Sequence, residues 1–317
     1  MAVVGIDVGG TKIAAAVLGE SGELYAKESR FLEGRGGDDA GELIIEMINA
    51  FMTRFPDKEF TGIGICVPGI YYSGKDTVWA PNIPGWDNYP LRHKIMKKVR
   101  DRSVEITIGS DRTCYILGEL WKGAARGCDN AIYLAVGTGI GAGILAEGRI
   151  LHGANDIAGA TGWLALQSPY REEYISAGCF EYYASGNGIA SRMHRALRCV
   201  RNYNGVLSGK RIEDITSYDV FQAYAQGDHL AAKVLDKAVE MWGMAAANLV
   251  SLFNPRKVIF GGGVFGPARM FIRRIYDEAC KWGQPIAMEQ VEFCASELAG
   301  GESALLGAAY LSLRREQ

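Results

Sequence analysis

The chain has 317 residues, of which 48% are hydrophobic and 22% are charged, a composition that excludes a disordered or fibrous protein. A globular chain of this length predicts two lobes, with a cleft between them for a ligand. The net charge of −2 gives no basis for a nucleic-acid partner or a membrane surface.

Cysteine usage and hydropathy predict a cytoplasmic protein. The seven cysteines are scattered and form no Cys-x-x-Cys pair, as in proteins of a reducing compartment. No apolar run approaches the roughly 20 residues that span a bilayer, and no signal-peptide pattern precedes the first predicted strand. We therefore expect neither secretion nor membrane insertion.

The first strand-like segment ends in a glycine turn. Apolar residues 2–6 lead to Asp7, and Gly9-Gly10-Thr11-Lys12 follows. Two glycines after a strand let backbone N–H groups approach an anion closely, while Thr11 adds a hydroxyl donor and Lys12 a charge. Asp7 is suited to hold Mg²⁺ directly or through water. Taken alone, such a turn is more often structural.

Periodicity predicts the remaining elements. Residues 2–30 predict two or three antiparallel strands, residues 40–53 a helix, and residues 63–67 a strand that Pro68-Gly69 ends. The second half is more helical. Its predicted elements are helices at 178–198, 217–226, 230–253, 268–282 and 303–314, and a strand at 257–260.

A second copy of the opening segment lies at residues 131–149. Val8-Gly9 aligns with Val136-Gly137, and Ala14 aligns with Ala142. A repeat at the start of each half predicts two related α/β lobes that each begin with a β-hairpin. Chance similarity of apolar and glycine residues is the alternative.

Two more glycine-rich loops follow predicted strands. Residues 137–143 include four glycines, and because surplus glycine weakens a strand, close backbone approach to a ligand is the better explanation. Gly261-Gly262-Gly263 leaves the strand at 257–260 ahead of a predicted helix. A nucleotide could lie there against bare backbone.

Asp111 follows the strand-like segment 104–109. A carboxylate at the end of a strand could accept the proton of a substrate hydroxyl group as that group attacks the γ-phosphate of ATP. A single aspartate after a strand is commonly a helix N-cap instead. The residue alone does not decide between these two roles.

Taken together, the motifs resemble those of the ROK family over nearly the whole chain. The resemblance implies an α/β, two-lobed, actin-like ATPase (ribonuclease H-like) fold and a sugar kinase or a sugar-responsive repressor. The repressors carry an N-terminal helix-turn-helix segment, which we expect this chain to lack. The matching segments are 7–12, Val67-Pro68-Gly69, 80–86, Asp111 with Leu117-Gly118-Glu119, 137–141, Gly153-Ala154-Asn155 and Gly178-Cys179-Phe180-Glu181.

The resemblance also implies roles for individual residues and favours a homodimer. Asp111 matches the catalytic base, and Gly69, Asn82 and Glu181 match the sugar pocket. The residues that match the ATP site are Gly9, Gly10, Thr11, Lys12, Thr138, Gly139, Gly261, Gly262 and Gly263.

The sequence departs from the family at its zinc motif. ROK glucokinases resemble one another in a Gly-Glu-x-Gly-His segment that holds sugar hydroxyl groups and zinc, but residues 159–163 are Gly-Ala-Thr-Gly-Trp. Of the zinc-binding Cys-x-Cys-Gly-x-x-Gly-Cys pattern, only Cys179 survives. One thiolate does not make the four-coordinate site that zinc prefers, so we predict no bound zinc.

Three positions that match sugar contacts, Ser110, Ala160 and Trp163, are altered together. Because an unpaired buried polar group costs about 1 to 3 kcal/mol, such a pocket should not favour glucose. Trp163 could stack on an apolar sugar face or be a core residue. Arg112 could reach a carboxylate or keto oxygen of the substrate, or be a surface residue at a helix start.

We therefore predict a kinase with one lobe at residues 1–112 plus a C-terminal helix at about 303–317, and a second lobe at residues 113–302. It is expected to use ATP and Mg²⁺ to phosphorylate a hydroxyl group of a non-glucose monosaccharide, cyclitol or related polyol. Asp111 is the predicted base and Asp7 the predicted metal ligand. The alternatives are an ordinary glucokinase and a non-catalytic sugar- or nucleotide-binding sensor.

Overall fold

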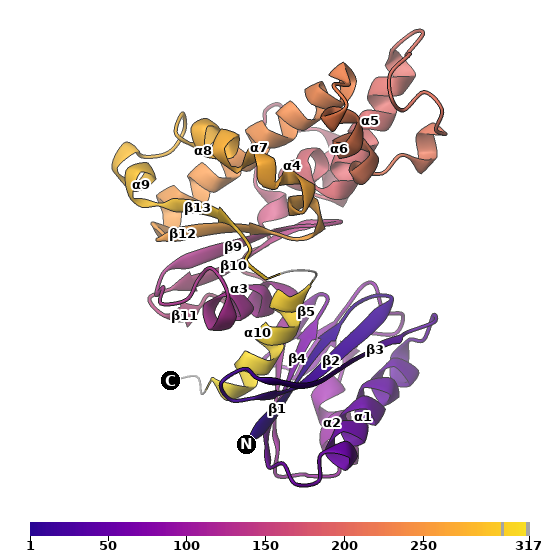
Figure 1. The fold of residues 1–317 in the computed structure, drawn as a ribbon, viewed down its shortest axis with the longest axis vertical. Helices are drawn as coiled ribbons and strands as arrows, with labels where there is room; N and C mark the ends of the chain where they lie inside the picture. The colour runs from indigo at the N-terminus through magenta and orange to yellow at the C-terminus, as the bar shows by residue number, and fades with distance from the viewer. Residues whose placement is uncertain (299–300, 315–317) are drawn as a thin grey trace. The chain divides into compact units, whose positions relative to one another are not determined.

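The computed structural model describes residues 1–298 and 301–314, and the chain divides into two compact units (Figure 1). Unit 1 comprises residues 1–127, 150–158 and 297–317, and unit 2 comprises residues 128–149 and 159–296. The boundary predicted at residue 112 falls inside unit 1, at the start of a helix. The last three residues of the helix predicted at 303–317 lie outside the described part of the chain.

Unit 1 is built on a five-stranded sheet with the order β3-β2-β1-β4-β8. β1 pairs antiparallel with β2, β2 antiparallel with β3, β1 parallel with β4, and β4 parallel with β8. The central strands are apolar and buried, as strands covered on both faces should be. The strands are β1 (Ala2–Val8), β2 (Lys12–Gly19), β3 (Leu24–Phe31), β4 (Phe60–Val67) and β8 (Glu105–Ser110).

Helices cover both faces of this sheet. α1 (Gly37–Arg54) and α2 (Leu91–Lys98) pack on the face that carries Val4 and Ile6. α3 (Asp111–Lys122) and α10 (Glu302–Leu313) pack on the face that carries Val3 and Cys66. The helix predicted at residues 40–53 is therefore confirmed, and the C-terminal helix completes the N-terminal unit.

Glycines let α10 approach its neighbours at backbone distance. A Cβ atom at Gly5 would lie 2.7 Å from the carbonyl oxygen of Leu305, and one at Gly64 would overlap that of Ala308. On the helix itself, a Cβ atom at Gly307 would overlap the carbonyl oxygen of Cys114 in α3. This close packing groups α3 with unit 1.

Unit 1 also contains a small antiparallel sheet with the order β5-β6-β7. Its strands are β5 (Ile70–Tyr72), β6 (Thr77–Trp79) and β7 (Asp87–Tyr89). Because β5 begins after the turn at Pro68-Gly69 and residues 80–86 leave β6, this sheet positions two of the predicted sugar-site segments.

The sheet of unit 2 repeats the plan of unit 1. Its order, β11-β10-β9-β12-β13, again has an antiparallel hairpin followed by two parallel strands. The predicted repeat of a β-hairpin at the start of each half is confirmed. The strands are β9 (Ala131–Val136), β10 (Ile140–Ala146), β11 (Arg149–Ile150), β12 (Lys257–Gly261) and β13 (Glu292–Ala295).

Unit 2 is rich in helices, and two of the predictions for them need correction. The helix predicted at 178–198 is two helices, because Ser185 accepts a hydrogen bond from Gly188 N and caps the second. The helix predicted at 268–282 begins as a 3-10 turn at Pro267–Phe271. The helices are α4 (Cys179–Ala184), α5 (Gly186–Cys199), α6 (Ser217–Ala225), α7 (His229–Phe253), α8 (Ile272–Ala279) and α9 (Pro285–Gln290).

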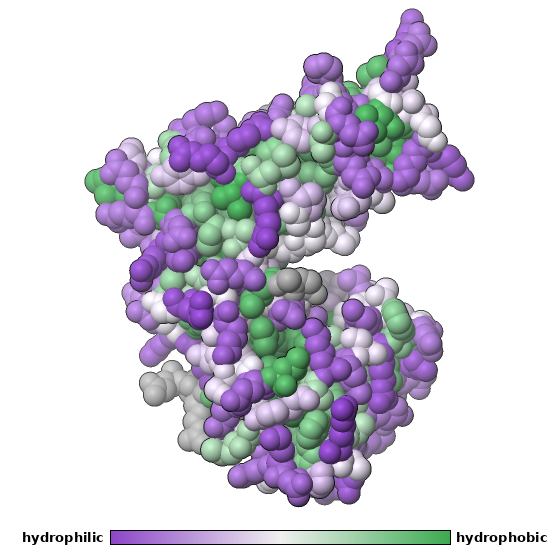
Figure 2. All heavy atoms as spheres, viewed as in Figure 1, coloured by the Kyte–Doolittle hydropathy of each residue, from purple (hydrophilic) through white to green (hydrophobic). Residues whose placement is uncertain are grey.

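Hydrophilic residues cover most of the face shown in Figure 2, with hydrophobic residues in smaller patches among them. Among the described residues, no helix combines the length and the apolar character needed to cross a membrane.

Candidate functional site

Asp111 stands at the junction of β8 and α3, but it does not cap the helix. Ser110 is the N-cap, since its side chain accepts a hydrogen bond from Thr113 N at 3.3 Å. Asp111 is the first helical residue, its Oδ1 accepts a hydrogen bond from Arg112 N at 2.8 Å, and 38% of its side chain is exposed. The N-cap alternative for Asp111 is therefore wrong, and its carboxylate stays accessible to a ligand.

Opposing effects set the protonation of Asp111. Burial among the surrounding atoms raises its pKa, whereas the guanidinium group and the backbone N–H of Arg112 lower it. A general base must be deprotonated before it can accept a proton. Arg112 thus favours the form of Asp111 that this role requires.

Asp7 is a second carboxylate of unit 1 whose pKa is raised. It lies on β1 opposite Cys66 of β4. Burial raises the pKa of Asp7 to about 6, the charge of Asp111 adds to this rise, and the Cys66 thiol and Lys12 oppose it. Because carboxylate oxygens are the ligands that Mg²⁺ prefers, Asp7 fits the magnesium role predicted for it.

The first predicted phosphate loop lies beside a predicted sugar residue. Gly9 N donates a hydrogen bond to Lys12 O at 2.9 Å, which closes the turn. A Cβ atom at Gly10 would lie 3.0 Å from the Cβ of Asn82. Thr11, Lys12 and Asn82 are exposed. Unit 1 thus brings loop 9–12 and Asn82 together.

The segment that carries Asn82 is fixed by a buried tryptophan. Trp86 donates a hydrogen bond from Nε1 to Gly37 O at 3.0 Å and stacks on Tyr89 with ring centroids 4.8 Å apart. Gly69 lies so close to this segment that a Cβ atom there would overlap the carbonyl oxygen of Trp79. Packing alone therefore explains the glycine at position 69.

In unit 2, the second glycine-rich loop meets the N-terminus of α5. Gly137 N donates to Gly139 O at 2.9 Å, and Gly186 N, at the first residue of α5, donates to Gly137 O at 2.8 Å. Helix N-termini favour anions through their free N–H groups and the helix dipole. A phosphate group at loop 137–139 would lie near the free N–H groups and the positive dipole end of α5.

The third loop is pressed against the end of β9. Gly262 has φ = 86°, and a Cβ atom there would overlap the carbonyl oxygen of Val136. A Cβ atom at Gly261 would overlap the hydroxyl group of Tyr133. At Gly263, by contrast, no described atom lies within 4 Å of the Cβ position. The fold explains the first two glycines, and Gly263 leaves open space.

Thr138 and Gly263 line one cavity of about 660 Å³, a volume typical of small-molecule sites. Its wall on α5 and residues 213–217 was not among the predicted site residues, although two capping motifs, at Ser185 and at Thr216 with Asp219, mark this wall. His194 Nε2 is hydrogen-bonded to Ile215 O at 2.7 Å. The lining residues are Gly137, Thr138, Gly186, Asn187, Ala190, Ser191, His194, Glu213, Ile215, Thr216, Ser217, Gly263 and Val264.

The side chain of Glu181 packs against the second glycine-rich loop. Its Oε2 accepts a hydrogen bond from Ile140 N at 2.7 Å, and a Cβ atom at Gly139 or Gly162 would lie 2.8 Å from that oxygen. Burial raises the pKa of Glu181, and the Ile140 N–H opposes this rise. Its second oxygen remains available to a ligand, so the sugar contact predicted for Glu181 stays a prediction.

Trp163 is not a core residue, so that alternative is wrong. The tryptophan is 59% exposed, while its backbone packs against Gly178, whose Cβ position lies 2.6 Å from the Trp163 Cα. The turn at Gly162-Trp163 therefore lies beside the start of α4, and the indole is presented to solvent.

Aromatic residues occupy the region that matches the family's zinc motif. Tyr174 is buried, and its hydroxyl group is hydrogen-bonded to that of Tyr183 at 3.0 Å. Across residues 1–298 and 301–314, no three or more His, Cys, Asp and Glu side chains are grouped as a metal site would need. The absence of zinc stays a prediction.

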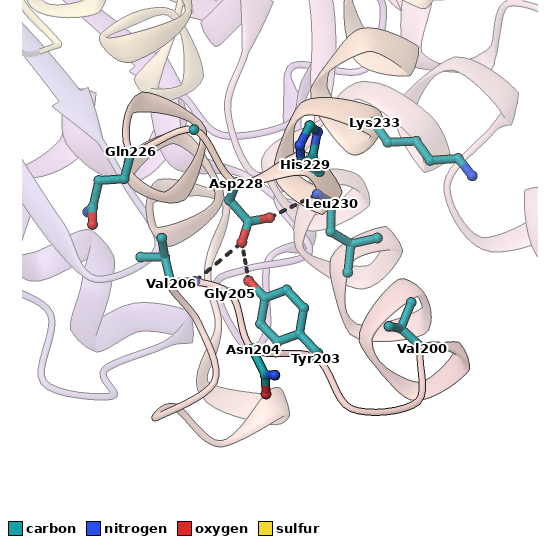
Figure 3. A pocket seen from close by; sticks show the side chains of 11 residues that line it. Val200, Tyr203, Asn204, Gly205, Val206, Gln226, Asp228, His229, Leu230 and Lys233 are labelled. Carbon is teal, nitrogen blue, oxygen red and sulfur yellow. Dashed lines mark hydrogen bonds between the residues drawn. The ribbon is translucent and has the colours of Figure 1, made fainter.

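A second cavity of unit 2, of about 590 Å³, lies at the start of α7 (Figure 3). Asp228 accepts hydrogen bonds from Leu230 N, Ala231 N and Val206 N, and from the Tyr203 hydroxyl group. The buried carboxylate thus caps α7 and ties down the loop at 203–206. This cavity contains none of the predicted site residues.

Comparison with known proteins places these features in a family. Residues 3–315 match the ROK family. A glucokinase of Halalkalibacterium halodurans is 30% identical, with 99% of this chain and 95% of the relative covered. A xylose repressor of Caldicellulosiruptor bescii is 28% identical, with 86% of this chain and 68% of the relative covered.

A solved structure agrees with both the fold and the family. The ROK family glucokinase from Streptomyces griseus in complex with glucose and AMPPNP is 27% identical, has a TM-score of 0.75, and is aligned over 98% of this chain and 99% of its own. The chain therefore belongs to the ROK family. The predicted family and the predicted two-lobed α/β fold class are confirmed.

Proposed function

We propose that this ROK protein transfers the γ-phosphoryl group of ATP to a hydroxyl group of a non-glucose monosaccharide, cyclitol or related polyol. The broader class, an ATP-dependent carbohydrate kinase, is that of kinase relatives aligned along their full length. The observation that carries the proposal is the carboxylate of Asp111. It starts α3, is partly exposed, and is not used as the helix cap.

Each unit supplies part of the chemistry. In unit 1, Asp111 accepts the proton of the attacking hydroxyl group, and Gly9, Gly10, Thr11 and Lys12 bind phosphate oxygens. In unit 2, the cavity lined by Thr138 and Gly263 takes the nucleoside and its adjoining phosphates. Gly139 shapes the second loop, and Gly261 and Gly262 shape the third.

Asp7 is the residue that would hold magnesium, directly or through water. When bound, Mg²⁺ neutralises charge that develops on the phosphate oxygens. The raised pKa of Asp7 supports this role, because a nearby cation would relieve the cost of a buried carboxylate.

The altered sugar contacts support a substrate other than glucose. The Ser110 hydroxyl group is used in the helix cap, Ala160 has no hydrogen-bonding side chain, and Trp163 offers an exposed ring for stacking. Gly69, Asn82 and Glu181 are the other residues proposed to contact the sugar. A site without partners for particular hydroxyl groups loses preference for the sugar that carries them.

We also propose a homodimer without zinc, located in the cytoplasm, where Mg-ATP is available. Light scattering on the purified protein would test the dimer, and elemental analysis would test for zinc. A monomer or a stoichiometric zinc content would overturn the corresponding part.

The substrate test is a coupled ADP-release assay across hexoses, amino sugars, sugar acids and inositols. We expect sugar-dependent ADP release for at least one compound, with glucose among the poor substrates. Strong glucose turnover would establish an ordinary glucokinase instead.

The base assignment is tested by Asp111→Asn. We expect kcat to fall about a thousandfold, because general acid–base catalysis contributes about 10²- to 10⁴-fold, while AMPPNP affinity stays unchanged. Asp57→Asn, at an exposed position, is the matched control and should leave kcat unchanged. Equal activity of the Asp111 variant and the wild type would refute the assignment.

A sensor is the second candidate, because the chain also matches a repressor over 86% of its length. A sensor binds its sugar without turning it over. Calorimetric sugar binding with no ADP release in the presence of bound nucleotide would favour the sensor over the kinase.

A further inference from the structure

Arg112 is an arginine whose side chain is mostly enclosed, directly after the proposed base. Only 13% of its side chain is exposed. Its Nη1 donates a hydrogen bond to Ile157 O at 3.2 Å, and its Nε lies 4.0 Å from Asp111 Oδ1. Arg112 thus lies at the helix start, as the alternative of a surface residue has it, but most of its side chain is enclosed.

The position of Arg112 is unfavourable for the fold itself. It is the second residue of α3, where the helix dipole disfavours a cation, and enclosure of a guanidinium group costs solvation energy. The carboxylate at 4.0 Å is beyond hydrogen-bonding distance, so it offsets this cost only in part. Local stability does not account for an arginine here.

Most of the donors of Arg112 remain available to a ligand. A guanidinium group has five N–H donors, and within the described chain its only hydrogen-bond acceptor is the Ile157 carbonyl group. None of its nitrogens is among the fully enclosed polar atoms without a partner, and 13% of the side chain is exposed. Nη2 and one N–H of Nη1 form an edge that can donate two hydrogen bonds.

The group that anchors Arg112 is itself fixed. Asp156, next to Ile157, accepts hydrogen bonds through Oδ2 from the backbone N and the Oγ of Ser73, both at 3.0 Å. Ser73 follows β5 in the small sheet of unit 1. The carbonyl group that orients the guanidinium group is thus tied to a sheet, which lowers the cost of ordering the arginine for a ligand.

From these contacts, and resting on the proposed function, we infer that the phosphoryl acceptor is a sugar acid whose carboxylate binds the Nη1–Nη2 edge of Arg112. The planar fork of a guanidinium group matches a carboxylate, and two parallel charge-assisted hydrogen bonds form. A neutral sugar would offer uncharged hydroxyl oxygens only, without the opposite charge and the paired oxygens that give a bidentate contact. Arg112 then gives preference for acidic substrates, and the neighbouring Asp111 deprotonates the hydroxyl group of the bound substrate.

The test compares sugar acids with neutral sugars of the same stereochemistry, such as hexuronates with hexoses, in the ADP-release assay. For the wild type, we expect a higher kcat/KM for at least one acid than for its neutral counterpart. Arg112→Gln should lower kcat/KM for that acid about a hundredfold, mainly through KM, because it removes one partner of a buried charged pair. The loss on the neutral sugar should be at least about tenfold smaller, since there the variant removes only the support that Arg112 gives to the charged form of Asp111.

Two further variants complete the experiment. Arg112→Lys keeps the charge without the planar fork and should give an intermediate loss on the acid. Arg126→Gln removes an arginine from an exposed position of unit 1 and should leave the preference unchanged. Retained AMPPNP binding by every variant shows that each is folded.

The outcomes separate the two proposals. Preference for a neutral sugar, or an equal loss on acid and neutral substrates in Arg112→Gln, overturns this inference and leaves the kinase standing. Absence of sugar-dependent ADP release with every compound, although AMPPNP binds, overturns the kinase proposal and this inference with it.

Discussion

Asp7 carries its charge at a cost to stability. Its pKa rises from 3.8 to about 6 on folding, so between these pH values the folded chain holds a proton that the unfolded chain has lost. Stability therefore falls as pH rises through this window, and the penalty is complete above about pH 6. The difference corresponds to about 3 kcal/mol at neutral pH.

Asp7→Asn should therefore stabilise the protein at neutral pH. We expect the free energy of unfolding at pH 7.5 to rise by about 1–3 kcal/mol, since the amide cannot ionise. The gain should shrink to about 0.5 kcal/mol near pH 4, where the aspartate is already protonated in the folded state. Urea unfolding in the presence of a metal chelator measures both values. The same variant should lose magnesium-dependent turnover.

An equal gain at pH 4 and pH 7.5 would contradict this account, because it would show that the effect does not come from ionisation. Asp57→Asn is the control at an exposed position and should change the unfolding free energy by less than about 0.5 kcal/mol at both pH values.

At the scale of residues, the candidate side chains could be predicted from the sequence, but their local roles could not. Ser110 and Asp111 are both good N-caps, and only the backbone shows that Ser110 takes this role. Exposure of Trp163 was equally undetermined, because a tryptophan after a glycine fits a core or a surface turn. The hydrogen bond from Arg112 to Ile157 O joins residues 45 positions apart in the chain. The sequence around Arg112 therefore could not predict it.

At the scale of elements, the third glycine loop contains glycines that packing requires and one that it does not. Gly262 has positive φ and no room for a side chain, whereas Gly263 has open space. The fold therefore requires glycine at 262 but not at 263. If a nucleotide lies over the loop, the open space at Gly263 is where it would approach the backbone.

This contrast predicts different outcomes for two alanine variants. Gly263→Ala should keep its unfolding free energy within about 1 kcal/mol of the wild type and should weaken AMPPNP binding about tenfold or more, because the added methyl group enters the cavity. Gly262→Ala should destabilise the protein by about 2 kcal/mol or more, through strain and overlap with Val136. Calorimetry and urea unfolding distinguish the two effects.

Unchanged AMPPNP affinity in Gly263→Ala would remove this loop from the nucleotide site. Gly74→Ala, at a glycine of unit 1 with no described atom near its Cβ position, is the control for the effect of the substitution itself.

The predicted elements were correct where one periodic pattern extended over a whole segment. α1 and α7 have such patterns, and both were found. The prediction of a single helix at 178–198 was wrong because helical periodicity continues across Ser185. A serine followed by Gly-Asn-Gly is itself a signal for a helix N-cap. Strong helix formers in 268–271 likewise hid the 3-10 turn that begins at Pro267.

At the scale of the whole molecule, the two units can be probed separately by hydrogen exchange. AMPPNP should slow exchange in unit 2 at loop 137–139, the first turn of α5 and residues 213–217, because these line the 660 Å³ cavity. Exchange at residues 203–206 and 228–233, around the second cavity, should not change. Slower exchange around the second cavity instead would place the nucleotide there and would contradict the proposed site.

The prediction of domains was based on the repeat of loop and hairpin. This repeat predicted two related α/β units. It could not show that α3 and residues 150–158 group with unit 1, because this grouping depends on the glycine contacts of α10 and on the bonds from Asp156 to Ser73.

The place of α10 has a consequence for how the protein is made. Ribosomes synthesise the sheet of unit 1 first, but the helix that covers Gly5 and Gly64 is encoded nearly three hundred codons later. Until residue 313 has left the ribosome, the apolar face with Val3, Ala16 and Leu18 lacks its cover. Unit 2 has all its strands by residue 295, so it can finish folding before the unit that began synthesis.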